Sequence, residues 1–176
     1  MAAVTPPARP RLARALLRLF AVQGSYNYER MLGLGVGVAE EPLLRELGDG
    51  KYRPAVARAG HFFNAHPYLI GLAVGAAARA EYEGAAPDQV ERLREALCGP
   101  LGSLGDRLVW AGGLPFLSGL ALAGVALGAG WIAVGSFLVV FNIGHVALRL
   151  RGDRLNGLRL SLALAALALV AGVIWQ

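Results

Sequence analysis

Two short stretches in the first half of the chain place amide, carboxylate and aromatic side chains next to one another. The first is QGSYNYERM at residues 23–31, and the second is HFFNAHPY at residues 61–68. Amide and carboxylate groups hydrogen-bond to hydroxyl groups, while an aromatic ring packs against the apolar face of a ligand. Side chains of these types, close together in sequence, predict binding of a polyhydroxylated ligand.

In the first stretch, Asn27 and Glu29 are the candidate ligand-binding residues, with Tyr26 and Tyr28 as stacking surfaces. Glu29 is the preferred single ligand. The alternative is that Glu29 and Arg30 form interfacial ion pairs with other partners. The residue types fit both interpretations equally.

In the second stretch, Asn64 and His66 are the candidate binding residues. Asn64 fits a second role equally well, because asparagine side chains commonly cap turns. Phe62 and Phe63 are interpreted as packing residues rather than as stacking platforms. Each histidine of the chain is expected to make a hydrogen bond rather than to accept a phosphoryl group; these are His61, His66 and His145.

A third motif, GPLGSLGD at residues 99–106, precedes a long apolar run. Its glycines predict a sharp, non-helical turn, which would place Asp106 at the start of the following helix. There a carboxylate accepts backbone N–H bonds, and this structural role is favoured over contact with the ligand. Asn142, inside the apolar run, is also a candidate for a structural or translocation role, because a polar group at membrane depth is costly and usually serves a purpose. Arg30 is assigned to the same group.

The sequence offers no catalytic constellation and no resident cofactor. It lacks a nucleophile elbow, an HExxH motif and a phosphate-binding loop, so the chain is not predicted to be an enzyme. The one cysteine, Cys98, has no partner for a disulfide and no metal-ligand spacing, and it is interpreted as a helix-packing residue. Catalytic residues and metal ligands are therefore both predicted to be absent.

The composition places the chain in the membrane class. Of its 176 residues 56% are apolar and only 16% are charged, against about 25% charged residues in soluble domains. The mean hydropathy is +0.50. The net charge of +5 is spread over a tail and loops, so the basic residues do not form the stripe that nucleic-acid binding requires.

The strongest membrane signal is residues 108–148, which are 41 consecutive residues without Asp, Glu, Lys or Arg. A helix of that length would span roughly 60 Å, which fits two crossings or a long broken hairpin. Gly112 to Pro115 is the expected break. Arginines 149, 151, 154 and 159 follow and predict a cytoplasmic loop, with the arginine-rich N-terminus on the same side. A last apolar stretch covers residues 160–175.

The preceding region is expected to be helical but not to cross the membrane. Residues 1–10 are rich in proline and predict a disordered tail. From residue 11 an amphipathic helix carries arginines on one face, so it either lies on an anionic lipid surface or packs on a partner with its arginines solvated. Residues 40–58 predict a solvated segment, and residues 69–78, too short to cross, a buried or re-entrant helix.

Later in this region, Pro87 and Asp88 predict a helix start, and the helix is expected to end at Gly99–Pro100. Glycines 33 and 37 are interpreted as a close-packing helix face rather than as a dinucleotide loop. The predicted organisation is a tail at 1–10, a helical region at 11–107 with interfacial and re-entrant segments, and a hydrophobic membrane region at 108–176. The predicted fold class is an all-α integral membrane protein with amphipathic and broken or re-entrant helices.

The three motifs, in this order and spacing, resemble the IID subunits of the mannose, fructose and sorbose phosphotransferase family. The resemblance extends from about residue 19 to 158 and includes Phe141 and Asn142 within the apolar run. It implies a multi-pass subunit of the cytoplasmic (inner) membrane that pairs with a IIC subunit and helps to bind and translocate a hexose. Separate IIA and IIB components would supply the phosphohistidines.

Some positions depart from the family pattern. The family usually has Pro where Arg107 stands, a carboxylate where His61 stands and Gln where His66 stands, and its members continue beyond residue 176. The resemblance therefore implies a shortened member. The alternative function is a transport-incompetent assembly or regulatory subunit of a phosphotransferase complex.

Overall fold

The computed structural model of the chain describes residues 9–151, and within that range all regular structure is helical. The elements in chain order are α1 Arg9–Phe20, the 3-10 turn η1 Val22–Ser25, α2 Gly33–Leu44, α3 Asp49–Ala59, α4 Ile70–Tyr82, α5 Pro87–Gly105, the π-helical segment η2 Asp106–Gly113, α6 Leu114–Ala126 and α7 Gly130–Arg151. This confirms the all-α prediction. Residues 1–8 and 160–175, for which a tail and a last apolar stretch are predicted, lie outside the described residues.

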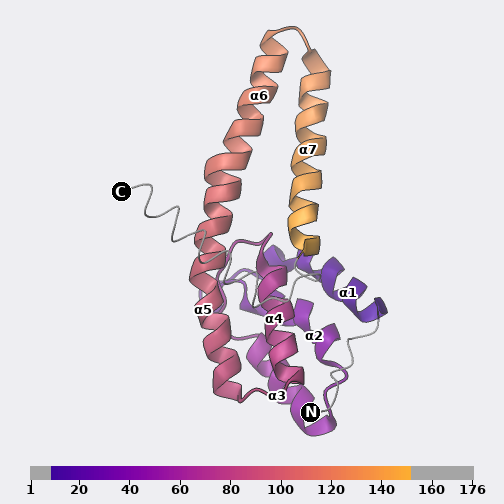
Figure 1. Ribbon diagram of the computed structural model, residues 1–176, viewed down its shortest axis with the longest axis vertical. Coiled ribbons are helices and arrows are strands. Elements are labelled where there is room, and N and C mark those ends of the chain that lie inside the picture. Colours follow the sequence, from indigo (N-terminus) through magenta and orange to yellow (C-terminus); the bar gives the residue numbers. More distant parts are fainter. Residues whose placement is uncertain (1–8, 152–176) are drawn as a thin grey trace.

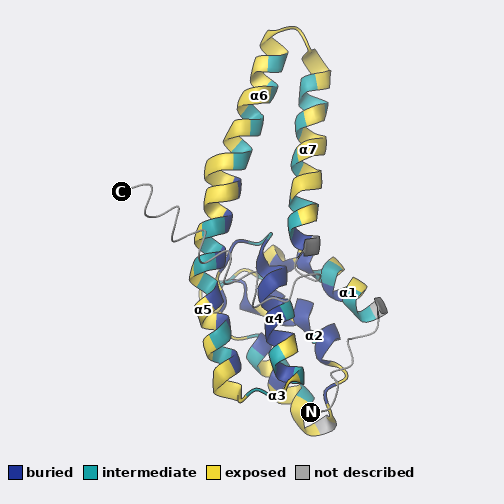
Figure 2. Cartoon of the chain, viewed as in Figure 1, coloured by how far each residue is buried: buried dark blue, intermediate teal, exposed yellow. Residues whose placement is uncertain are grey.

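The molecule consists of a compact bundle and a two-helix hairpin that extends from it (Figure 1). Helices α1 to α4 and most of α5 form the bundle, while η2, α6 and α7 form the hairpin, which turns at residues 127–129. Buried residues gather in the bundle, and the hairpin is largely exposed (Figure 2). Two helical stretches are long and apolar enough to cross a membrane, Pro87–Ala126 and Gly130–Arg149. The uncharged run is thus a helical hairpin.

The centre of the bundle is built by α2 and α4. Ile70, Ala73 and Ala77 of α4 are fully buried, which confirms a buried helix in the stretch that is too short to cross a bilayer. Helix α2 packs against α1, α3 and α4. A Cβ atom on Gly33 would lie 1.9 Å from the backbone oxygen of His61, so glycine is required for this approach.

Helix α1 packs on α2 through a buried face that includes Ala15 and Leu19. It begins at Arg9, two residues earlier than expected. The interpretation of a helix packed on a partner is confirmed, but two of its arginines are paired rather than simply solvated. Arg11 lies 2.7 Å from Glu46, and Arg18 lies 2.7 Å from Glu41. Contact of the exposed face with lipid stays a prediction.

Glu41 joins α1, α2 and α3 through three hydrogen bonds. Arg18, Arg45 and Tyr52 donate to its carboxylate at 2.7, 2.5 and 2.8 Å. Burial by itself would raise the pKa of the Glu41 carboxyl, but these three donors outweigh it and lower the pKa to about 2. Glu41 is therefore ionised throughout the physiological range.

Glu40 contradicts the prediction that residues 40–58 are solvated. The residue is 1% exposed, and Arg94 of α5 donates to its carboxylate at 2.7 Å. Arg94 also donates to the Ala59 carbonyl at 2.7 Å and lies over the Phe63 ring at 5.4 Å. The reason is that this face of α2 is packed inside the bundle, where Arg94 of α5 reaches a carboxylate that looks exposed in the local sequence.

A continuous helix replaces both breaks expected around the third motif. Helix α5 does not end at Gly99–Pro100 but runs through Pro100 to Gly105, and η2 then continues it without interruption into α6. Gly112 to Pro115 therefore do not break the helix, although the π-helical segment η2 includes Gly112 and Gly113. Continuing the helix satisfies backbone groups internally, which an apolar surrounding requires.

Candidate functional site

The loop at residues 60–69, between α3 and α4, carries the second motif and is held by backbone hydrogen bonds to the first. The Leu32 N–H donates to the Phe63 carbonyl at 2.9 Å, and the Phe63 N–H donates to the Arg30 carbonyl at 3.3 Å. Phe63 is fully buried and anchors the loop, which confirms its interpretation as a packing residue, whereas Phe62 is 53% exposed and the same interpretation is wrong for it. These contacts place the two polar motifs side by side.

The third motif reaches this loop because α5 carries glycine where the loop crosses it. A Cβ atom on Gly105 would lie 2.1 Å from the Cβ of His66, and one on Gly102 would lie 3.8 Å from the Cα of Ala65. The prediction of a sharp turn at residues 99–105 is therefore wrong. Two glycines of this segment serve close packing of a loop against a continuous helix.

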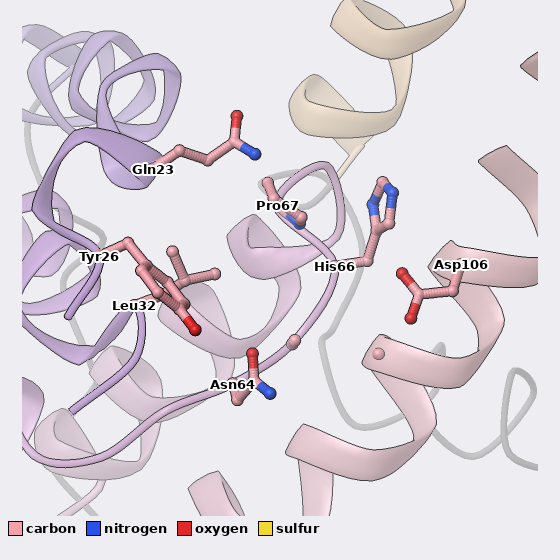
Figure 3. Close-up of a pocket in the computed structure, with 9 residues that line it drawn as sticks. Gln23, Tyr26, Leu32, Asn64, His66, Pro67 and Asp106 are labelled. Atoms are coloured by element: carbon pink, nitrogen blue, oxygen red, sulfur yellow. The ribbon is translucent and has the colours of Figure 1, made fainter. Parts of the chain in front are cut away.

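A cavity of about 420 Å³ opens between the three motifs. This volume falls in the range of about 300–1,000 Å³ that is usual for small-ligand sites. Its lining residues come from all three motifs and are Gln23, Tyr26, Leu32, Asn64, Ala65, His66, Pro67, Gly102 and Asp106 (Figure 3). The lining therefore offers two amides, a phenol, an imidazole and one carboxylate.

Three of the predicted site residues meet at this cavity. Asn64 and His66 come from the loop, and Asp106 comes from the adjacent long helix (Figure 3). Asp106 is exposed and lies inside a continuous helix, so the prediction that it stands at a helix start is wrong. The reason is that no turn precedes it, which leaves its carboxylate facing the cavity.

The other predicted residues lie outside the lining. Asn27 shapes the first motif, because its Oδ1 accepts the N–H groups of Glu29 and Arg30 at 3.1 and 2.8 Å. The Glu29 side chain is 85% exposed and lies 4.0 Å from that of Arg30, so ion pairs of either residue with other partners stay a prediction. Asn142 is exposed on α7 and donates to the Leu138 carbonyl at 2.7 Å. Glu29 as a ligand therefore stays a prediction.

Among the polar side chains that line the cavity, Gln23 was not a sequence candidate. Gln23 is the first residue of the QGSYNYERM motif, so its amide was a signal in the sequence. It reaches the cavity from the η1 turn, whereas Glu29, six positions later, lies in the turn that the backbone bridge between Asn27 and Met31 closes.

His66 is buried beside the cavity, with 1% of its surface exposed. Its Nδ1 accepts the Tyr68 N–H at 3.3 Å, and its Nε2 has no partner among the described residues. Burial lowers the pKa of His66, and Arg149 lowers it further, although Asp106 raises it. The imidazole is therefore neutral at pH 7, and because Nδ1 accepts, the proton resides on Nε2.

The other two histidines have different surroundings. His61 Nδ1 lies 3.3 Å from the Glu91 carboxylate of α5, which agrees with an interhelical hydrogen bond. His145 of α7 stacks on Tyr68 at 5.0 Å, and its buried Nδ1 has no hydrogen-bond partner in the described part of the chain. The hydrogen bond expected for His145 is therefore replaced by ring contacts. Within residues 9–151 no three metal-ligating side chains gather.

Comparison with known protein families matches residues 8–155 to the PTS system mannose/fructose/sorbose family IID component. The chain belongs to this IID family. It is 30% identical over 144 residues to the mannose-specific EIID component of Escherichia coli K12, covering 77% of this chain and 50% of that protein. It is 33% identical over 152 residues to the sorbose-specific EIID component of Klebsiella pneumoniae, covering 82% and 55%.

A solved structure gives the same result for the IID fold. The cryo-EM structure of the mannose transporter ManYZ in complex with microcin E492 is similar with a TM-score of 0.75 and 27% identity, covering 86% of this chain and 58% of that one. The fold prediction of a helical membrane protein is thereby confirmed. IID components are non-catalytic membrane subunits of these permeases, so the prediction that the chain is not an enzyme is confirmed as well. The chain spans about half the length of the curated relatives it matches.

Proposed function

We propose that this IID chain helps to bind and translocate a hexose together with a IIC subunit, and that the cavity between its three motifs contributes the sugar contacts. The supporting observation is the convergence of Asn64, His66 and Asp106 on one cavity of about 420 Å³. Carboxylate and amide groups pair with sugar hydroxyls, and the Tyr26 ring offers a surface for an apolar sugar face.

We assign sugar binding, but not sugar phosphorylation, to this chain. Asn64 and Asp106 can hydrogen-bond to a sugar, whereas the buried, neutral His66 forms part of the cavity wall and lacks the exposure that a phosphoryl acceptor needs. Membership of the IID family supports assigning phosphorylation to separate IIA and IIB components. The relatives' names give mannose, sorbose and fructose as the sugars to test.

Asp106→Asn is expected to raise the KM for sugar uptake roughly 10- to 100-fold, because a charge-assisted hydrogen bond contributes about 1.5–3 kcal/mol. Asn64→Ala is expected to raise it roughly threefold to tenfold by the loss of a neutral hydrogen bond. The measurement is uptake of radiolabelled mannose, fructose and sorbose by cells that make this chain, a IIC subunit and the phosphoryl donors.

Asp88→Asn is the matched control, because Asp88 lies at the far end of the same continuous helix, exposed and paired with Arg92 at 2.6 Å. An unchanged KM in both cavity variants would remove the cavity from the transport path. Glu29→Gln belongs in the same series. If the KM rises in that variant alone, the sugar contacts the exposed surface around Glu29 and not the cavity.

The second candidate function is a transport-incompetent assembly or regulatory subunit. It is favoured by the change at position 61, where the family resemblance implies a carboxylate and this chain has His61. The His61 side chain lies against Glu91. For this function we expect stable co-purification with a IIC subunit and no saturable sugar binding. Saturable binding of any of the three sugars rules it out.

We also propose that the bundle lies on the cytoplasmic side of the inner membrane. A hairpin that crosses and returns leaves the bundle and the end of α7 on one side, and the arginines after residue 148 favour the cytoplasm. A protease added to inside-out vesicles should remove an N-terminal epitope, whereas right-side-out vesicles should protect it. The reverse pattern would invert this orientation.

A further inference from the structure

Arg149, at the end of α7, is buried although sequence patterning predicts a solvated cytoplasmic arginine. Its surface is 4% exposed, and it forms no ion pair among residues 9–151. Its guanidinium lies over the Phe20 ring at 4.8 Å and over the Tyr68 ring at 5.0 Å. The prediction is wrong because α1 and the loop before α4 cover the base of the hairpin.

The guanidinium also caps α1. Its Nη1 donates to the carbonyl of Leu19, in the last turn of that helix. Carbonyls in a last helical turn lack an intrahelical partner, and the helix dipole favours a cation there. Arg149 therefore contacts α1 through the Leu19 carbonyl and the Phe20 ring, and it contacts the cavity loop through the Tyr68 ring.

Tyr68 connects this contact to the cavity. Its N–H donates to His66 Nδ1, and its ring meets the His66 ring edge-on at 4.9 Å. His66 and Pro67, the two residues before it, line the cavity. The Tyr68 ring also stacks on His145 of α7, at 5.0 Å. The position of Tyr68 is thus determined jointly by the hairpin and by the loop that lines the cavity.

We propose that Arg149 is a positioning residue for the cavity, acting through Tyr68. It fixes the loop at residues 64–67 by holding Tyr68 and the end of α1 against α7, so the geometry of the cavity depends on the seating of the hairpin. A planar guanidinium can stack on two rings while donating a hydrogen bond, and a lysine ammonium cannot reproduce this arrangement. The expected effect on sugar uptake rests on the proposed function, whereas the role of Arg149 in positioning the loop does not.

Arg149→Ala is expected to raise the KM for sugar uptake roughly tenfold, and amide hydrogen exchange in residues 60–69 should become roughly tenfold faster. Arg149→Lys should rescue neither quantity fully. Tyr68→Leu should reproduce the effect, Tyr68→Phe should not, and the double variant should be no worse than either single one. Arg14→Ala, which removes an exposed arginine from α1, is the control.

The two measurements separate this inference from the proposed function. A purely structural loss would lower the amount of folded protein and the maximal uptake rate while leaving the KM unchanged, and it would overturn the proposal. Faster exchange confined to the loop, in a chain that takes up no sugar, would support the role of Arg149 and remove the sugar site. Unchanged exchange in Arg149→Ala would overturn the role of Arg149.

Discussion

Arg94→Ala is expected to destabilise the folded chain by roughly 3–5 kcal/mol, the usual cost of leaving one partner of a buried ion pair alone. The variant leaves Glu40 buried without its donor and removes the hydrogen bond to the Ala59 carbonyl. Arg92→Ala is the matched control on the same helix. Its pair with Asp88 is exposed, so the loss should stay below about 1 kcal/mol.

Denaturant unfolding of the purified protein in detergent measures both variants. Equal losses for Arg94→Ala and Arg92→Ala would show that the pair with Glu40 is not buried in the folded protein. Glu40→Gln keeps the size of the side chain and can still accept the hydrogen bond from Arg94, but it leaves the buried guanidinium without an anionic partner, so it should also destabilise the chain.

The same pair predicts a pH dependence. Burial raises the pKa of Glu40 from 4.5 to about 7, against the opposing effect of Arg94. The folded chain therefore retains a proton that the unfolded chain releases above pH 4.5. The contribution of Glu40 to stability is fully present below pH 4.5 and is lost as the pH rises through 7. Glu40→Gln should abolish this slope, and an unchanged slope would assign it to another group.

Gly105→Ala is the second change with a large expected effect, because its methyl group would meet His66 at 2.1 Å. The loop must move away from α5, so we expect a loss of at least about 2–3 kcal/mol in stability and the loss of saturable sugar uptake. Gly99→Ala is the matched control in the same helix, since nothing lies within 4 Å of the added atom.

Gly99→Ala should stabilise the chain by up to about 1 kcal/mol, because alanine is the better helix former. Thermal unfolding and sugar uptake, measured on both variants, test the pair. Equal stability of the two variants would mean that the loop does not lie against Gly105.

The amino-acid sequence was sufficient for the helical class, the apolar hairpin and the family. A run of 41 uncharged residues has few outcomes other than membrane helices, because ionised groups at membrane depth are costly and backbone groups there must be paired internally. The three polar motifs likewise identified Asn64, His66 and Asp106 as candidates. These signals are local, so they can be read without knowing what packs against them.

Tertiary structure decided which polar groups meet and which lose contact with water. Glu40 and Arg94 lie 54 positions apart, and Arg149 and the Leu19 carbonyl lie 130 apart, so no periodicity indicates these contacts. The glycines of α5 are typical of a turn in the sequence, but in the structure they lie in a helix and let the loop cross it at Gly105. Burial and close approach are properties of two surfaces together, and a single stretch of sequence specifies only one of them.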